Sequence, residues 1–426
     1  MPKEVIDAAM HGNLVVFAGA GVSTESRTVF QETFYEEVAE ELGIRNTENI
    51  DFPSLMSLYC EEQNGRRKLL NKIYQRFEYC KQFDGLYRDA TDFHRELSSI
   101  FSITNIITTN WDDFFERECM AIPFVTGEDF VFFDIDSRKI FKIHGSIGNI
   151  GSIIATKEDY NKCYRNLQKG VIGGYLKTLL ATKVILFVGF SFSDFDFNRI
   201  YSFLKKEMGN VLPHAYIITI DPKMDKRFSR SEMTVIKTSG SFFFRTLREH
   251  LEGIKFLFPK STLQIVWALD SERHKSNKKA IEDFFKEKSV AKVYNLFYQE
   301  GIEHAFQYLF HNTKTGKSFN PVGIDKSIRV YESLKKEKKK IGYYHDVAYI
   351  DGYLVGLHAM FLNSETDYRP FYYVMGIGPL NTFNEYKSYL KEKKVYHKSA
   401  EKLGKRIFKD FLEKKTDLIP IHQPFV

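Results

Sequence analysis

The stretch Leu14-Val-Val-Phe-Ala-Gly-Ala-Gly-Val-Ser23 decides the fold of the N-terminal half of the chain. Its apolar run stops at a Gly-Ala-Gly turn, as a buried strand that leads into a tight loop does. Glycines let backbone N–H groups approach a phosphate, and a helix beginning behind the loop adds favourable electrostatics. Thr24 stands where the dinucleotide-binding fingerprint G-x-G-x-x-G has its third glycine. A plain strand-to-helix turn therefore stays an open alternative.

Residues 1–255 alternate between strand-like and helix-like segments, which predicts a Rossmann-like parallel α/β sheet with inserted helices. Strands are expected where β-branched or wholly apolar runs occur, and helices where apolar residues recur at helical spacing. The strands expected beyond the first are 103–109, 139–143, 152–155, 184–188 and 215–220, and the expected helices are 33–42, 54–77 and 175–181.

The character of the sequence changes near Phe258, and residues 262–426 are predicted to form a smaller α+β domain. Asp351-Gly352 stands between two aromatic, β-branched runs and predicts a β-hairpin over 344–362. The segment Thr315-Gly-Lys-Ser318 resembles a P-loop but lacks its first glycine, so a plain loop is expected. The other expected elements are strands over 264–269 and 371–374 and helices over 278–288 and 383–415.

Composition excludes several classes of protein. A length of 426 residues suggests two or three domains, and 43% hydrophobic residues exclude a disordered chain. No apolar run approaches the ~18 residues that span a bilayer, and the N-terminus has no secretory apolar segment. The four cysteines contain no CxxC pair, which argues against a zinc ribbon and a disulfide framework. We therefore expect a cytoplasmic protein without a membrane segment.

The net charge of +6 is unevenly distributed. Residues 326–340 hold seven Lys/Arg against two acids, and residues 385–415 hold eleven against five. The remainder of the chain is thus acidic by 5 charges. A uniform nucleic-acid-binding surface is not expected, and any nucleic-acid contact is predicted only for the basic C-terminal region.

Three further motifs follow expected strands: Thr108-Thr-Asn-Trp-Asp112, Lys142-Ile-His-Gly145 and Val188-Gly-Phe-Ser-Phe-Ser-Asp194. In an open parallel sheet, ligands bind at the carboxyl ends of the strands. An asparagine there can orient water or a sugar hydroxyl, and a histidine can take up a proton. Each motif also has an ordinary structural interpretation, in which Asp112 caps a helix, His144 is a packed core or surface residue, and the last motif caps the helix that follows it.

Together, the four motifs resemble the sirtuin family. In that family the Gly-Ala-Gly-x-Ser loop binds the NAD diphosphate, and Thr-x-Asn-x-Asp lies by the nicotinamide ribose. The His-Gly supplies the catalytic histidine, and the later Gly-x-Ser loop touches the adenosine half. The resemblance covers about residues 10–255 and implies NAD+ as substrate. It implies catalytic roles for Asn110 and His144, and NAD+ contacts by Ala18, Gly19, Ala20, Gly21, Ser23, Thr108, Thr109, Asp112, Gly189, Ser191 and Asp221.

Two departures separate this chain from the protein-deacylating sirtuins. Those enzymes carry four zinc-binding cysteines after the His-Gly, where this chain has only Cys163. Their Gly-Ile-Pro-Asp-Phe-Arg segment is replaced by residues 24–28. The pattern is more similar to the bacterial anti-phage NAD hydrolases of the Thoeris, defence-associated sirtuin and sirtuin–HerA types, which 53–77 and 155–160 also resemble. This likeness implies a bacterial protein that needs no zinc.

The resemblance implies an NAD+ glycohydrolase that releases nicotinamide and ADP-ribose as the toxic effector of abortive infection. Cleavage passes through an oxocarbenium-like transition state, and neutral nicotinamide leaves without a general acid. We hypothesise that Asn110 positions water or the ribose hydroxyls, and that His144 is the base or a ribose orienter. Asp112 is expected to orient the carboxamide or to stabilise its loop. A catalytically silent NAD- or ADP-ribose-binding scaffold and a zinc-free deacylase stay open as alternatives.

Partners are predicted from composition and from analogy. The chain has 39 Phe and 24 Tyr, and aromatic residues in excess of core needs suit interfaces, so we expect a homo-oligomer. The resemblance suggests a HerA-like ATPase or another phage-sensing partner as the trigger. Residues 262–426 are expected to serve oligomerisation or partner binding.

Overall fold

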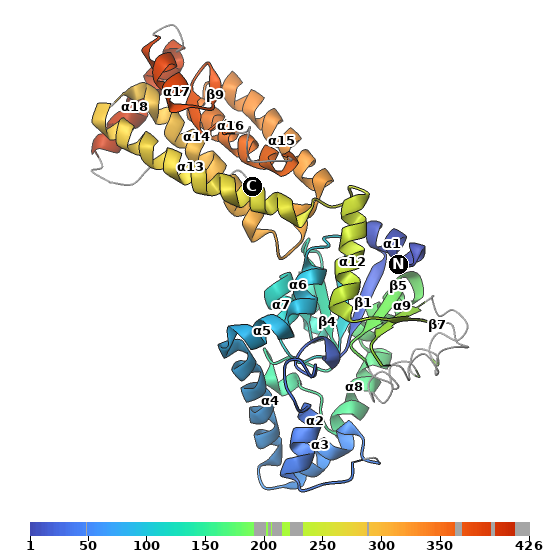
Figure 1. The fold of residues 1–426 in the computed structure, drawn as a ribbon. Coiled ribbons are helices and arrows are strands. Elements are labelled where there is room, and N and C mark those ends of the chain that lie inside the picture. The colour runs from blue at the N-terminus through green and yellow to red at the C-terminus, as the bar shows by residue number, and fades with distance from the viewer. Residues whose placement is uncertain are drawn as a thin grey trace. The chain divides into compact units, whose positions relative to one another are not determined.

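The structure is a computed structural model, which describes residues 1–47, 49–190, 202, 206, 215–221, 233–287, 289–362, 369–392 and 397–413 (Figure 1). The chain divides into two compact units. The first comprises Met1–Ile254 with Lys314–Gly316, and the second comprises Lys255–Thr313 with Lys317–Val426.

The first unit is built on a seven-stranded parallel sheet in the order β3-β4-β2-β1-β5-β6-β7. The chain fills one side of β1 first and then continues on the other side from β5 onward. At such a switch point the loops that leave neighbouring strands diverge and leave a crevice at the carboxyl edge. The strands are β1 (Leu14–Ala18), β2 (Asn105–Thr108), β3 (Ile122–Phe124), β4 (Lys139–Lys142), β5 (Val184–Val188), β6 (Ala215–Thr219) and β7 (Met233–Lys237).

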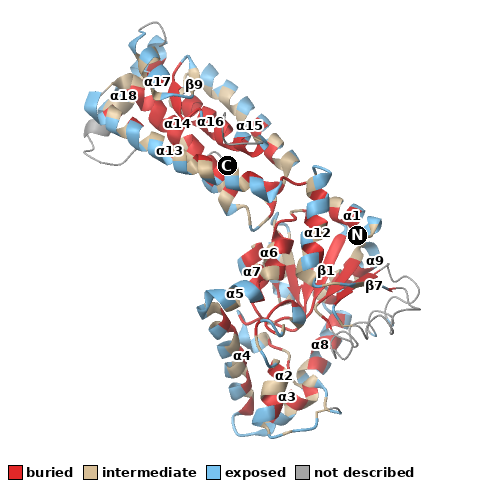
Figure 2. Cartoon of the chain, viewed as in Figure 1, coloured by how far each residue is buried: buried red, intermediate tan, exposed pale blue. Residues whose placement is uncertain are grey.

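The central strands are apolar along their whole length because helices cover both faces of the sheet (Figure 2). Every residue of β1 is buried, and the rings of Phe17 and Phe187 stack with their centroids 5.2 Å apart. The described helices of this unit are α1 (Lys3–Met10), α2 (Phe34–Glu41), α3 (Phe52–Glu61), α4 (Gly65–Gln82), α5 (Asp84–Ala90), α6 (Asp92–Ser98), α7 (Phe114–Cys119), α8 (Lys157–Lys169), α9 (Val171–Thr182) and α12 (Gly240–Gly253), with 3-10 turns η1 (Ala20–Val22), η2 (Gly127–Phe132) and η3 (Ile150–Ser152).

The predicted parallel α/β fold is confirmed, with five expected strands observed as β1, β2, β4, β5 and β6. The strand expected at 152–155 is wrong, because η3 leads into a connection that shares only isolated backbone bonds with its neighbours. The helix expected at 54–77 is two helices. Asn64 adopts a left-handed φ of 60° between α3 and α4 and so breaks the helix. The sequence analysis missed the short strands β3 and β7.

The second unit is mainly helical. Its small antiparallel sheet consists of β8 (Tyr372–Val374), which confirms the strand expected at 371–374, and β9 (Gly378–Leu380). The single helix expected over 383–415 is observed as two helices, α17 and α18. The helices are α13 (Lys260–Glu287), α14 (Val293–His311), α15 (Pro321–Lys340), α16 (Tyr344–His358), α17 (Phe383–Lys391) and α18 (Lys398–Glu413), with 3-10 turns η5 (Val290–Lys292), η6 (Lys317–Phe319) and η7 (Ala359–Phe361).

The β-hairpin predicted over 344–362 is wrong, since these residues form α16 and η7. Gly352 is a point of close helix packing rather than a turn. A Cβ atom placed there would lie 1.9 Å from the carbonyl oxygen of Tyr298 on α14, and one at Gly301 would lie 2.0 Å from that of Tyr349. The strand expected at 264–269 is also wrong, because α13 runs through it.

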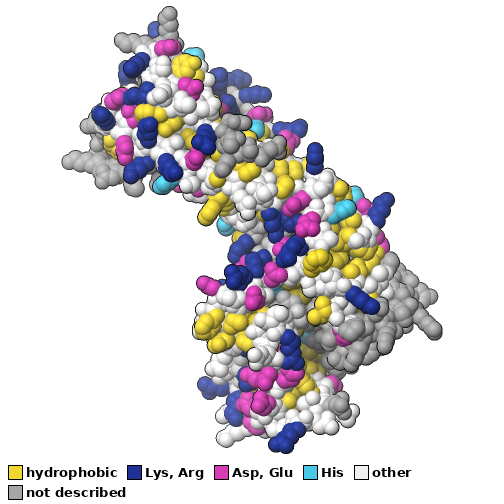
Figure 3. Space-filling view, in the orientation of Figure 1, with side chains coloured by type: hydrophobic (Ala, Val, Ile, Leu, Met, Phe, Trp, Pro, Cys, Tyr) yellow, Lys and Arg dark blue, Asp and Glu magenta, His cyan; other side chains and the backbone are white. Residues whose placement is uncertain are grey.

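The basic run at the end of α15 is partly neutralised within the second unit. Lys338 pairs with Asp346 at 2.7 Å, and Lys335 pairs with Asp351; both carboxylates belong to α16 and are buried. On the face seen in Figure 3, Lys and Arg side chains of this unit are interspersed with acidic ones. The excess positive charge of the sequence therefore does not form a uniform basic face in this view.

The plain loop expected for Thr315–Ser318 is observed only at Thr315 and Gly316, because Lys317 and Ser318 belong to η6. Lys314–Gly316 pack within the first unit, where Gly316 has a φ of +77° and a Cβ would lie 2.7 Å from the Ser98 carbonyl oxygen. The buried guanidinium of Arg138 donates to the carbonyl oxygen of Lys314 at 3.3 Å. Among the helices that the structure describes, none is both long and apolar enough to cross a bilayer.

Candidate functional site

A pocket of about 870 Å³ opens at the carboxyl edge of the sheet, beside the switch point between β1 and β5. The loops after β1, β2, β4 and β5 form one side of it, and the helices inserted between β1 and β2 form another. Of the residues predicted to bind NAD+ or act in catalysis, the pocket is lined by Ala20, Gly21, Ser23, Thr109, Asn110, Asp112, His144 and Gly189.

The Gly-Ala-Gly loop is held tightly against the end of β5. The Gly19 N–H donates to the Val188 carbonyl at 2.8 Å, and the Gly21 N–H donates to the Gly189 carbonyl at 3.0 Å. A Cβ atom at Gly21 would lie 2.8 Å from that same Gly189 oxygen, so a side chain is excluded there. Both glycine N–H groups are used within the protein, and a phosphate contact from this loop must involve its other donors.

The end of β2 is tied to β1 by a threonine. The Thr108 hydroxyl donates to the Ala18 carbonyl at 3.0 Å and accepts from the Asn110 N–H at 3.0 Å. The Thr109 N–H also reaches the Ala18 carbonyl, at 3.3 Å. Thr108 is fully buried and so orients the turn that carries Asn110.

A chain of hydrogen bonds joins Ser23, Asn110 and Asp112 from two different loops. The Ser23 hydroxyl donates to Asp112 Oδ2 at 2.9 Å, and Asn110 Nδ2 donates to Ser23 Oγ at 3.4 Å. Asp112 Oδ1 accepts from the Phe114 N–H at 3.1 Å at the start of α7, but the N-cap position of this helix belongs to Asp113 and not to Asp112 as the capping alternative expected. Asn110 Oδ1 is buried and has no protein hydrogen-bond partner. It is therefore available to accept from a ligand in the pocket.

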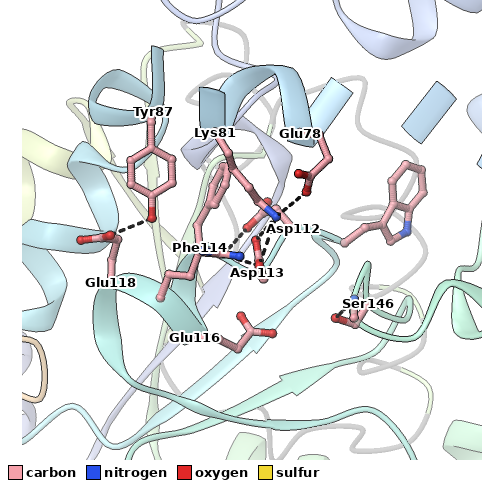
Figure 4. A network of polar contacts seen from close by, with 12 residues as sticks. Glu78, Lys81, Tyr87, Asp112, Asp113, Phe114, Glu116, Glu118 and Ser146 are labelled. Atoms are coloured by element: carbon pink, nitrogen blue, oxygen red, sulfur yellow. Dashed lines mark hydrogen bonds and ion pairs between the residues drawn. The ribbon is translucent and has the colours of Figure 1, made fainter. Parts of the chain in front are cut away.

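Asp112 is surrounded by protein, and this burial raises the pKa of its carboxyl group to about 6. The Lys142 ammonium and the Phe114 N–H oppose the rise. Figure 4 shows Asp112 beside the Phe114 backbone, next to the ion pairs of Lys81 with Glu78 and Asp113. Burial therefore makes Asp112 harder to ionise than a solvent-exposed aspartate.

His144 forms part of the pocket wall and is only 1% exposed. Its ring meets that of Tyr160 edge to face at a centroid distance of 4.8 Å. The following residue, Gly145, has a φ of +85°, and a Cβ there would lie 2.2 Å from the Ser152 carbonyl oxygen. The glycine after the histidine is therefore required by the local backbone.

Comparison with known families gives this arrangement a context. Residues 104–240 match the family model of the SIR2-like domain. The matched range contains Asn110, Asp112 and His144, while the Gly-Ala-Gly loop precedes it.

Curated proteins with related sequences are NAD hydrolases and a defence sirtuin. NAD(+) hydrolase ThsA of Enterococcus faecium is 31% identical over 224 residues, which cover 51% of this chain and 45% of that protein. Its namesake from Bacillus cereus is 28% identical over 209 residues, or 47% of this chain and 41% of that protein. Defense-associated sirtuin 2 of Bacillus subtilis is 26% identical over 247 residues, or 52% and 22%. The similarity spans less than half of each relative, and it confirms the predicted resemblance to sirtuin-like defence NAD hydrolases.

Some predicted site residues do not line the pocket. Ala18 and Gly19 take part in the hydrogen bonds described above through their backbone groups, and Thr108 takes part through its hydroxyl. Asp221 follows β6, where its N–H donates to the Thr219 hydroxyl at 3.0 Å. Ser191 lies outside the described residues.

The sequence analysis missed the pocket residues that come from the helical insertion. Glu25 Oε2 accepts from the Phe34 N–H at 2.8 Å, and Glu25 Oε1 lies 3.3 Å from the Arg76 guanidinium. Burial raises the pKa of Glu25, and Arg76 opposes that rise. Trp111 lies edge to face with Phe34 at 6.1 Å. The capping box at Thr33 signals the start of α2, but no local pattern links Glu25 with a residue 51 positions away.

The residues that the structure describes contain no cluster of three or more His, Cys, Asp or Glu side chains suited to a metal ion. The four cysteines, all among the described residues, form no disulfide. Cys163 donates its thiol hydrogen to the Ile143 carbonyl at 3.1 Å and packs in the core.

Proposed function

We propose that this chain is an NAD+ glycohydrolase, which cleaves NAD+ into nicotinamide and ADP-ribose. One observation carries the proposal: the buried Oδ1 of Asn110 has no hydrogen-bond partner in the protein and can accept a hydrogen bond from a ligand hydroxyl, in the pocket that His144 also lines. The printed name of the ThsA relatives, NAD(+) hydrolase, supports the same activity for the matched half of the chain.

The chemistry requires the site to hold the ribose and to bring water to its anomeric carbon. Nicotinamide leaves as a neutral base, so the transition state develops positive charge on the ribose without needing an acid. In our proposal Asn110 Oδ1 accepts a hydrogen bond from the attacking water or from a ribose hydroxyl. Its amide is held by Ser23, which is itself held by Asp112. This relay fixes the direction of the asparagine oxygen before substrate arrives.

His144 is proposed to take up the proton of the water or to orient the ribose. Because it is buried against Tyr160, its ring is shielded from bulk solvent and held in one orientation. The nearby Asp112 carboxylate is proposed to orient the carboxamide of nicotinamide or to stabilise the loop.

NAD+ is proposed to lie along the carboxyl edge of the sheet. The pocket-lining residues Ala20, Gly21, Ser23 and Thr109 would border the diphosphate and the nicotinamide ribose, while the buried Ala18, Gly19 and Thr108 would hold these loops in place. Gly189, Ser191 and Asp221 would border the adenosine half, since β5 and β6 follow the switch point.

We further propose a role as effector in anti-phage defence, because the relatives include a protein named Defense-associated sirtuin 2. In this proposal the enzyme works in the cytoplasm as a homo-oligomer and is activated through a phage-sensing partner such as a HerA-like ATPase. Residues 262–426 would provide the oligomer or partner contacts.

Nicotinamide release from NAD+ by the purified chain, with and without candidate partners, tests the activity. Asn110→Ala and His144→Ala are each expected to abolish release, whereas Asn161→Ala on the exposed surface of α8 leaves it unchanged. NAD+ binding without release under every triggering condition favours the silent scaffold. Release that depends on an acyl-lysine peptide favours a deacylase. Turnover that survives both site substitutions refutes the assignment of the two residues.

A further inference from the structure

Lys142 is a buried lysine that the catalytic proposal does not use. Its side chain is 0% exposed, although it belongs to the end of β4 only two residues before His144. Its ammonium donates to Glu116 Oε1 on α7 at 2.9 Å, to the Trp111 carbonyl at 3.5 Å and to the Asp112 carbonyl. Burying an ammonium is costly, and an apolar side chain of the same length could fill this space without that cost.

The contacts of Lys142 converge on the turn that carries the proposed active site. Two of its three acceptors are backbone carbonyls within the segment from Asn110 to Asp112. The third, Glu116, has an exposed fraction of 18% and lies in the first turn of α7, whose first residue, Phe114, donates its N–H to Asp112. The ammonium therefore ties together the strand that leads to His144 and the turn that holds Asn110.

We propose that Lys142 is a positioning residue: its ammonium holds the turn of Asn110 and keeps the Asp112 carboxylate ionised, while Glu116 acts in the opposite direction. The effect on turnover rests on the proposed function, but the effect on Asp112 does not. An ionised Asp112 accepts hydrogen bonds from both Ser23 and the Phe114 N–H. A protonated carboxyl group turns one of its oxygens into a donor and so disturbs the relay to Asn110.

The groups around Asp112 come from four elements. Lys142 belongs to β4, Glu116 and the Phe114 N–H to α7, and Ser23 to the loop after β1. The fourth element is α4, which contributes Cys80, and the pKa of its thiol is raised to about 11 by burial and by Asp112. Of the charged groups, Lys142 lowers the pKa of Asp112 most, and Glu116 raises it less.

The test uses the ionisation of Asp112 without any NAD+. The chain has two tryptophans, and Trp267 is 73% exposed on α13 of the second unit. In a Trp267→Phe background, the fluorescence of Trp111 reports on the neighbouring carboxyl group as pH is varied. Asp112→Asn removes the transition and so identifies it. Lys157→Met, on the exposed surface of α8, is the matched control and leaves the midpoint in place.

The proposal predicts an order of midpoints. Lys142→Met raises the midpoint by about 1 pH unit, since a neighbouring opposite charge is lost. Glu116→Gln lowers it. The double variant Lys142→Met/Glu116→Gln leaves no uncompensated buried charge and gives a midpoint above that of the parent but below that of Lys142→Met. If Lys142→Met does not fold, the midpoints of the double variant and of Glu116→Gln still test the proposal, because the first must lie above and the second below that of the parent.

The same variants are measured for nicotinamide release as a function of pH. The acid limb of kcat/KM is expected to move with the fluorescence midpoint in each variant. Midpoints that do not move, or that move in the same direction in both single variants, overturn the proposal. Fluorescence midpoints in the predicted order without any nicotinamide release support the role of Lys142 and count against the proposed function alone.

Discussion

Replacing Gly145 by alanine tests whether the backbone after His144 determines the geometry of the site. Gly145 has a φ of +85°, which an L-residue adopts only at a cost of about 1 kcal/mol. The alanine Cβ would also lie 2.2 Å from the Ser152 carbonyl oxygen and 2.8 Å from the Ile153 nitrogen. Gly43→Ala is the matched control, because Gly43 has a φ of +69° with nothing within 4 Å of its Cβ position.

The segment that opposes Gly145 cannot move away easily. The Ser152 hydroxyl accepts from the Ser146 N–H at 3.0 Å and donates to the Asn149 carbonyl at 2.6 Å. The Ile154 N–H donates to the His144 carbonyl at 3.0 Å. Relieving the overlap must break some of these bonds, and forced repacking of this kind costs about 1–3 kcal/mol. We therefore expect Gly145→Ala to lower the free energy of unfolding by that amount more than Gly43→Ala does.

Unfolding of the first unit is followed by Trp111 fluorescence in the Trp267→Phe background, so that the second unit does not contribute. A change of 1 kcal/mol corresponds to roughly 2–4 °C in Tm for a domain of this size. Nicotinamide release is expected to fall with Gly145→Ala, because His144 moves with the backbone, and to persist in Gly43→Ala. Equal stability and equal activity of the two variants would refute the argument.

Three further predictions concern burial. Arg138→Met is expected to lower the free energy of unfolding by about 3–5 kcal/mol, because the guanidinium donates to the carbonyls of five residues and these carbonyls lose their partner. Urea unfolding measures this loss, and a loss below about 1 kcal/mol contradicts the prediction. The pKa of Asp112 rises from 3.8 to about 6 on folding, so the native state still holds the proton at pH values where the unfolded state has lost it. The free energy of unfolding therefore falls by about 3 kcal/mol as the pH rises from about 4 to about 6. Asp112→Asn should remove most of this fall. If the free energy of unfolding of the parent and of Asp112→Asn changed with pH in parallel, Asp112 would not be its cause. Gly352→Ala is expected to destabilise the second unit by more than about 3 kcal/mol, because the added Cβ forces α14 and α16 apart. Gly174→Ala on α9 has open space at its Cβ position and should be neutral or stabilising by about 0.5–1 kcal/mol. Thermal unfolding followed by circular dichroism compares the two variants.

Local patterns predicted the first unit better than the second. The apolar run of β5 and the Gly-Ala-Gly turn after β1 are features of a few adjacent residues, and both appear as expected. Asp351-Gly352 is equally local but misleading, because α14 covers it and makes the glycine a packing contact within α16. Tertiary packing therefore overrode turn propensity there.

The sequence by itself determined the parallel α/β alternation of the first unit, its strands β1, β2, β4, β5 and β6, and the motifs that follow four of them, since a parallel sheet brings strand ends to one edge. Only the tertiary structure decided which strands are neighbours and that Glu25 and Arg76 meet in the pocket. It also decided that the ammonium of Lys142 is buried behind Asp112. Burial and desolvation depend on all the elements packed around a side chain, and no short stretch of sequence contains that information.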